Sequence, residues 1–193
     1  MSDMIRNTRQ TQGEVDSMFT DRWSPRAMSP DPISEEQLAM LFEAARWAPS
    51  CFNEQPWLFV YATSPVGRAQ FTEVLVEKNR RWAGQAPLLL FVLARRTFRH
   101  NGKPNRHAVF DAGAAWMSLA LQARRLGLYA HGMAGFSQEK AYGLLQLSPE
   151  EFEVIAAVAV GRHGDPAELP DDLRQMESPN GRKPREEIAV RFG

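Results

Sequence analysis

Two short segments of the chain carry side chains that could hold a phosphate group. In the first, Arg22, Ser24 and Arg26 occupy alternate positions of a loop that follows a short predicted helix. In the second, Arg182 and Lys183 come directly before a proline near the end of the chain. Arginine offers a planar fork of donors that matches phosphate oxygens in pairs, and a serine hydroxyl adds a further hydrogen bond. Surface arginines are commonly no more than solvated, so each cluster by itself is also compatible with a plain surface loop.

A third segment, residues 48–57 with the sequence APSCFNEQPW, joins the end of a predicted helix to the start of a predicted strand. It combines a proline that ends the helix, small or amide side chains at Ser50, Cys51 and Asn53, and a second proline before an aromatic residue. We interpret this corner as a place that holds a polar, planar ligand. Cys51 has no obvious histidine partner, which favours a packed thiol over a nucleophile.

Length and composition indicate one domain of ordinary size. The 193 residues are 44% apolar and 24% charged, which is typical of a soluble globular protein that can bury a core. Lysine plus arginine equals aspartate plus glutamate at 23 each, so the charge indicates neither a nucleic-acid nor an anionic-membrane partner. The four histidines lack the spacing of metal ligands, and we expect no metal site. A single cysteine, without a signal-peptide or membrane-spanning apolar run, predicts a cytoplasmic protein.

The elements that must position these side chains alternate between helices and strands. Residues 1–15 are polar and are predicted to form a flexible arm, and residues 16–193 form a single domain. Ser34 is a good N-cap with Gln37 at the third helical position, and it predicts a helix that ends before Pro49. The other expected helices cover residues 15–21, 65–78, 111–126 and 137–145, and the expected strands cover 58–61, 88–93, 131–135 and 154–160. This order predicts a sheet flanked by helices.

The segment APSCFNEQPW resembles the signature of the FMN-dependent nitroreductase family, which is usually written APSSxNxQPW. The resemblance runs from about Phe19 to Ile188 and includes the R-x-S-x-R pattern at residues 22–26 and the R-K-P pattern at residues 182–184. It implies an α+β nitroreductase-like fold, in which helices flank a central, mostly antiparallel sheet. It also implies an intertwined homodimer with each flavin at the subunit interface, and a dimerisation helix that opens at Asp111.

The resemblance also implies a set of cofactor-binding residues. Basic and serine side chains would hold the FMN phosphate and ribityl chain, residues 49–53 would line the isoalloxazine ring, and the backbone near residue 134 would face its N5 edge. The implied set is Arg22, Trp23, Ser24, Arg26, Pro49, Ser50, Cys51, Asn53, Asn79, Met133, Ala134, Gly135, Arg182 and Lys183.

Three departures from the family pattern bear on these expectations. Cys51 replaces the usual second serine, and a thiol is a weaker donor than a hydroxyl. Trp23 replaces a common arginine, which exchanges a charge for a ring that could cover the cofactor. Residues 94–110 form a short segment, so we expect the helical excursion of larger members to be reduced or absent.

By resemblance, the protein uses FMN and takes electrons from NADPH or NADH in a ping-pong reaction. The acceptors would be small molecules such as nitroaromatics, quinones or enones, and the flavin rather than a side chain would carry the electrons. Three alternatives remain open at this point. They are a flavin-fragmenting enzyme of the same fold, a flavin-binding module without turnover, and a structural domain without a cofactor.

Overall fold

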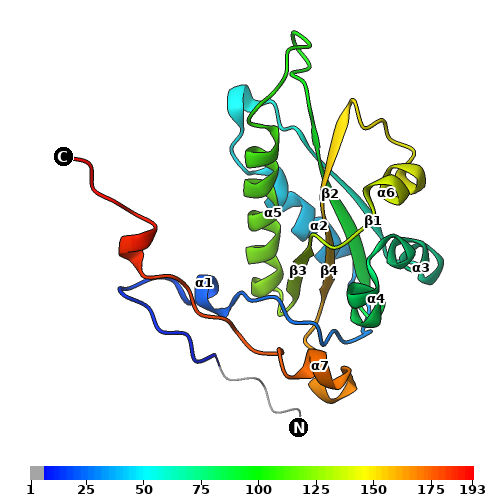
Figure 1. Cartoon of the computed structure of the whole chain (residues 1–193), viewed down its shortest axis with the longest axis vertical. Coiled ribbons are helices and arrows are strands. Elements are labelled where there is room, and N and C mark those ends of the chain that lie inside the picture. The colour runs from blue at the N-terminus through cyan, green and yellow to red at the C-terminus, as the bar shows by residue number, and fades with distance from the viewer. Residues whose placement is uncertain (1–6) are drawn as a thin grey trace.

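Four antiparallel strands form the central sheet of the computed structural model, which describes residues 7–193 (Figure 1). The strands are β1 (Trp57–Ala62), β2 (Leu88–Arg95), β3 (Tyr129–Met133) and β4 (Phe152–Gly161), in the spatial order β1-β2-β4-β3. Each neighbouring pair is antiparallel. The apolar run in β2 predicted a buried strand, and β2 is buried along nearly its whole length. The architecture is the α+β fold that the resemblance implies.

Helices cover both faces of the sheet (Figure 1). The helices are α2 (Glu35–Arg46) and α5 (Ala108–Arg125) on one face, and α3 (Pro65–Val74), α4 (Glu77–Ala83) and α6 (Gln138–Leu145) on the other. Side chains alternate between the two faces of a strand. Leu90 of β2 therefore joins the apolar cluster beneath α2 and α5, while its neighbour Phe91 joins the cluster beneath the other three helices.

Local capping explains where two of these helices begin. The Ser34 hydroxyl accepts a hydrogen bond from the Gln37 N–H, and the Gln37 side chain accepts one from the Ser34 N–H, so α2 has the predicted reciprocal cap. The Ser137 hydroxyl accepts from the Lys140 N–H at the start of α6. In contrast, α5 begins at Ala108 rather than at the predicted residue 111.

The single helix predicted over residues 65–78 is wrong, because the structure has two helices there. α3 ends at Val74 and α4 begins at Glu77, and the two residues between them are extended. The Val76 N–H donates to the Gly135 carbonyl, and Leu75 forms a bridge with Phe136. Pairing with a distant segment therefore replaces the helical hydrogen bonds at this point.

The two ends of the chain run together along one edge of the domain (Figure 1). The N-terminal segment leads into the short helix α1 (Ser17–Asp21), and α7 (Asp171–Arg174) precedes the C-terminal tail. Of the predicted arm, residues 1–6 lie outside the described part of the structure, and residues 7–15 lie beside residues 180–185. The Arg185 N–H donates to the Gln12 side chain at 2.7 Å. The tail then leaves the domain with Ile188, Val190 and Phe192 exposed.

Over residues 7–193, none of the helices combines the length and the apolar character needed to cross a membrane.

Candidate functional site

Three arginines gather where the N-terminal segment meets the C-terminal segment. Burial, and then the charge of Arg182, lower the pKa of Arg22. The pKa of Arg9 is lowered by burial and then by Arg182 and Arg22, against a smaller opposing effect of Asp21. Within residues 7–193, none of the three forms an ion pair with a carboxylate. Three cations that repel one another, without a paired carboxylate, favour an anionic ligand.

Arg9 is the member of this cluster that sequence reasoning missed. It lies in the polar segment that was predicted to be a flexible arm, where an arginine has no distinguishing neighbour. Only the folded chain brings it to Asn180, which lies 171 positions away.

The loop that carries Arg22, Ser24 and Arg26 is held by the buried carboxylate of Glu177 and the partly buried ring of His131. The Glu177 carboxylate accepts hydrogen bonds from the Arg26 N–H at 2.8 Å and from the Ala27 N–H at 2.9 Å. The ring of His131 places Nδ1 2.9 Å from the Pro25 carbonyl oxygen. A carbonyl can only accept, so Nδ1 carries the proton. Burial lowers the pKa of His131, which favours its neutral form. These contacts fix the loop backbone from which Ser24 and Arg26 project.

Trp23 lies in the same loop, but its ring points into the protein. The indole is 5% exposed and packs against Tyr129 and His163, with ring centroids 6.0 and 5.6 Å apart. The guanidinium of Arg124, at the end of α5, lies over Tyr129 at 4.0 Å. In this position Trp23 secures the loop to the end of α5, and its ring is not available to cover a ligand.

Asn79 contacts the segment that follows β3. Its Nδ2 donates to the Gly135 carbonyl at 3.0 Å, and the Val76 N–H donates to the same oxygen. A Cβ added at Gly135 would lie 2.8 Å from Asn79 Nδ2 and from Val76 Cγ2, so a glycine is needed for this close approach. Met133 is buried, whereas Ala134 is exposed and presents its backbone at the surface. His131, two residues before Met133, connects this segment to the Arg22–Arg26 loop.

The segment Pro49–Asn53 has a constrained conformation at the opposite end of α5. The Cys51 N–H donates to the carboxylate of Asp111, which is buried in the first turn of α5, at 3.0 Å. The Ser50 hydroxyl accepts from the Gln55 N–H at 3.0 Å. Phe52, Asn53 and Gln55 all have positive φ, at 53°, 54° and 50°. Such a run of non-glycine residues is rarely populated and is typical of functional loops.

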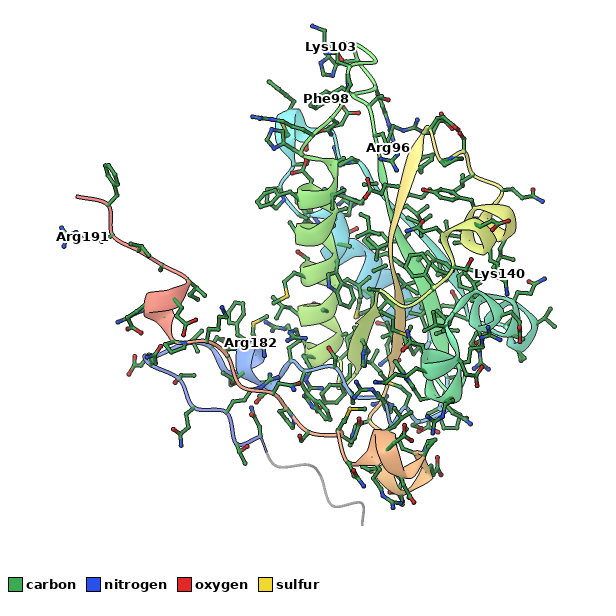
Figure 2. The ribbon with its side chains drawn as sticks, viewed as in Figure 1. Arg96, Phe98, Lys103, Lys140, Arg182 and Arg191 are labelled. Atoms are coloured by element: carbon green, nitrogen blue, oxygen red, sulfur yellow. The ribbon has the colours of Figure 1, made fainter. Side chains whose placement is uncertain are left out.

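The structure thus divides the predicted site residues into two groups within one chain. Arg22, Ser24, Asn79, Gly135 and Arg182 belong to the group near the carboxyl end of α5, and Pro49–Asn53 lies at its amino end. Figure 2 places Arg182 and Phe98 at these two ends, and Phe98 contacts Phe52 with ring centroids 6.0 Å apart. The 18 residues of α5 at about 1.5 Å each separate the groups by roughly 27 Å. A single flavin cannot reach both groups of the same chain.

Lys183 lies beside Arg182 in the exposed C-terminal segment. Its Nζ is 3.4 Å from a carboxylate oxygen of Glu187, one helical turn further along the chain. Both side chains are largely exposed, so the pair is weak and leaves Lys183 available to an anion.

Residues 96–107 form an irregular loop between β2 and α5. This loop contains turns and a bridge between Thr97 and Pro104 but no helix, which confirms that the helical excursion is absent. Glu54 accepts a hydrogen bond from the Arg99 N–H at 2.8 Å and so connects the loop to the Pro49–Asn53 segment. Sequence reasoning did not identify this connection, because it depends on a contact across 45 positions.

Among residues 7–193, no three histidine, cysteine, aspartate or glutamate side chains are gathered closely enough to hold a metal ion.

Comparison with known proteins places this arrangement in a family. The model of the nitroreductase family matches residues 19–81 and 67–162. A crystal structure described as an oxidoreductase containing FMN is 44% identical, covers 98% of each chain and has a TM-score of 0.92. A structure from Exiguobacterium sibiricum, provisionally named a nitroreductase and solved in complex with FMN, shares the fold. It has a TM-score of 0.78 and 19% identity over 96% of this chain and 100% of its own.

Two curated relatives extend the comparison. A Streptomyces coelicolor protein with the provisional name NADH dehydrogenase/NAD(P)H nitroreductase is 25% identical over 82% of this chain and 90% of its own length. A CLA biosynthesis enone reductase from Lactiplantibacillus plantarum is 23% identical over 84% of this chain and 90% of its own length. Because the family model spans well over half of the chain and a structure 44% identical aligns along nearly all of it, the protein is an oxidoreductase of the nitroreductase family.

Proposed function

We propose that the protein binds FMN and passes electrons from NADPH or NADH to a small acceptor. The observation that carries the proposal is the cluster of Arg9, Arg22 and Arg182, three guanidinium groups without an ion pair inside residues 7–193. A phosphate dianion is the ligand that such a cluster favours. Two similar structures, one of an oxidoreductase containing FMN and one solved in complex with FMN, support this choice of ligand.

The remaining residues of the first group fit the rest of an FMN molecule. Ser24 and Arg26 lie in the loop that Glu177 and His131 hold, which also carries Arg22 of the arginine cluster, and we assign both to the flavin site. Asn79 and the backbone of Ala134 and Gly135 would offer hydrogen bonds to the polar edge of the isoalloxazine ring. These groups are positioned by contacts within the chain, so they are preorganised for a ligand.

A second copy of the chain would supply the other half of the site. Residues 49–53 lie too far along α5 to reach the first group of their own chain, so we assign them to the flavin of a partner in a homodimer. The outer face of α5 supports this assignment, since Phe110, Gly113, Met117 and Leu121 follow one another at helical spacing. Phe110 is 78% and Met117 36% exposed, and a side chain at Gly113 would meet open space. An apolar stripe of this kind favours a partner helix.

The protein's part in the reaction is to bind and orient. When bound, FMN supplies the redox chemistry, by accepting a hydride from NAD(P)H and passing two electrons to the acceptor. The arginine cluster would neutralise the phosphate, and backbone N–H groups near residue 134 would face the part of the ring where negative charge develops. No side chain is assigned the role of acid, base or nucleophile.

The acceptors we propose are nitroaromatics, quinones and enones. The name of the Lactiplantibacillus plantarum relative supports an enone. The absence of a helix within residues 96–107 supports an open approach to the ring in this protein. The single cysteine, Cys51, is free, and we propose that the enzyme works in the reducing environment of the cytoplasm.

Absorbance spectroscopy of the purified protein tests the proposal. We expect a flavin spectrum that bleaches when NADPH or NADH is added under nitrogen and returns when a quinone follows. Loss of the flavin in air after reduction would instead indicate a flavin-fragmenting enzyme, and a flavin that neither nicotinamide reduces would indicate a binding module. A colourless protein that takes up no FMN at high concentration would overturn the proposed function.

A further inference from the structure

Arg9 joins the two segments that carry the other arginines of the cluster. Its Nη1 donates to the carbonyl of Thr20 at 2.8 Å and to that of Arg22 at 2.7 Å. Its Nε donates to the carbonyl of Asn180 at 2.7 Å. Thr20 lies in α1 and Arg22 directly follows that helix, whereas Asn180 lies two residues before Arg182. One guanidinium therefore holds the backbones of both segments.

The hydrogen bonds of Arg9 hold its positive charge close to those of Arg22 and Arg182. Arg22 and Arg182 each lower the pKa of Arg9, so the three cations repel one another. Carbonyl oxygens offset part of this repulsion, because each of them turns its negative end toward the guanidinium. Arg9, which is partly buried, thus brings two further arginines together, and an anion placed among the three would relieve the remaining repulsion.

Two of these arginines, Arg9 and Arg182, line a groove. Its volume is about 770 Å³, and it runs between residues 9–20 on one side and residues 180–188 on the other, with Arg9, Arg182 and Lys183 in its wall. Figure 2 shows Arg182 at this place, beside α1 and the N-terminal segment. The groove is thus open to a ligand and lined by positive charge.

We propose that Arg9 is a positioning residue of the FMN phosphate site, which sets the distance between Arg22 and Arg182 and adds a third positive charge. The inference rests on the proposed function and extends it to the N-terminal segment. Arginine suits this role better than lysine, because its fixed fork of donors reaches three carbonyls at once.

The chain offers a matched control in Arg68. Its guanidinium also ties backbone carbonyls together, with Nη1 donating to Ala86 at 2.9 Å and to Gly84 at 3.2 Å. Arg68 lies in α3, outside the arginine cluster. An Arg68→Gln variant loses a similar set of hydrogen bonds without changing the charge near the phosphate site.

The experiment is a pair of fluorescence titrations, with FMN and with riboflavin, which lacks the phosphate. We expect Arg9→Gln to weaken FMN binding about tenfold or more, since a charge-assisted contact is worth roughly 1.5–3 kcal/mol. Riboflavin binding should change less than about threefold, a difference of well under 1 kcal/mol. Arg9→Lys should fall between Arg9→Gln and the unaltered protein, and Arg68→Gln should change the two affinities alike. The FMN affinity of Arg9→Gln should also depend less on salt concentration.

The results separate the inference from the function on which it rests. If the unaltered protein binds FMN and Arg9→Gln binds it equally well, the inference is overturned and the proposed function stands. If Arg9→Gln lost FMN and riboflavin affinity equally, Arg9 would have a general structural role, and the inference would also be overturned. If the unaltered protein binds neither flavin, the proposed function fails and the inference fails with it.

Discussion

Replacing Glu177 by glutamine should destabilise the protein and weaken FMN binding together. The Glu177 side chain is 1% exposed and accepts the N–H groups of Arg26 and Ala27. It also faces the guanidinium of Arg26 at 4.0 Å and Nε2 of His163 at 3.6 Å. The carboxylate therefore anchors the Arg22–Arg26 loop to the segment that leads to Arg182, and both carry proposed phosphate ligands.

The loss in the free energy of unfolding can be worked out from the two N–H groups, of Arg26 and Ala27, that Glu177 accepts. A bond to a charged acceptor contributes about 1.5–3 kcal/mol and one to a neutral acceptor about 0.5–1.5, so the neutral amide of Glu177→Gln loses about 1 kcal/mol per bond. The expected loss is about 2 kcal/mol in the free energy of unfolding. For a chain of this size, that lowers the Tm by about 4–8 °C. Glu177→Ala, which leaves both N–H groups buried and unpaired, should lose about 3–5 kcal/mol.

The assay is urea denaturation at fixed protein and FMN concentrations, combined with an FMN titration of the folded variants. Glu153→Gln is the control, because the Glu153–Arg96 pair is exposed and its loss should change stability by less than about 0.5 kcal/mol. If Glu177→Gln were as stable as the unaltered protein and kept its FMN affinity, the carboxylate would not anchor the loop.

Four further results are expected. Arg182→Ala should weaken FMN binding by about ten- to a hundredfold, as one charge-assisted contact predicts, and an unchanged FMN affinity would contradict the assignment. Cys51→Ser should retain nearly full activity in a quinone-reduction assay, since the family pattern has serine there, and an inactive variant would point to a working thiol. Burial lowers the pKa of His131 below its ordinary value of 6.5, so the unfolded chain binds more protons and stability should fall as the pH drops below 6.5. His131→Asn should flatten that dependence in urea titrations at several pH values, and an unchanged slope would exclude His131 as its source. Met117→Glu should yield monomers in sedimentation velocity and lose FMN, whereas a flavin-loaded monomer would argue against a shared site.

The parts of the fold that depend on local interactions could be predicted from the sequence. The start of α2 follows from Ser34 and Gln37, which cap the helix across three positions. The buried strand β2 follows from its run of apolar residues. Both depend on neighbours in the chain, so a sequence pattern contains the information.

The break between α3 and α4 could not be predicted in this way. Residues 75 and 76 lie in a helical pattern, but they pair with residues 136 and 135, which are 61 and 59 positions away, and become extended. A tertiary contact determines their conformation, and local helix propensity cannot predict such a contact.

The candidate site shows the same division. The proposed ligand side chains were predicted through a resemblance, but the residues that hold them were not. Glu177 reaches Arg26 across 151 positions and Arg9 reaches Asn180 across 171, and neither stands in a recognisable pattern. Positioning residues of this kind become visible only when the chain is folded.

The two residue groups lie at opposite ends of α5, and this separation has a consequence for mixtures of two inactive variants. A chain altered at Arg182 keeps a sound Pro49–Asn53 corner, and a chain altered at Asn53 keeps a sound arginine cluster. In a dimer of one chain of each kind, one flavin site combines the intact arginine cluster with the intact Pro49–Asn53 segment. The other flavin site carries both substitutions. Two inactive proteins should then restore part of each other's activity on mixing, up to half that of the unaltered enzyme in each mixed pair.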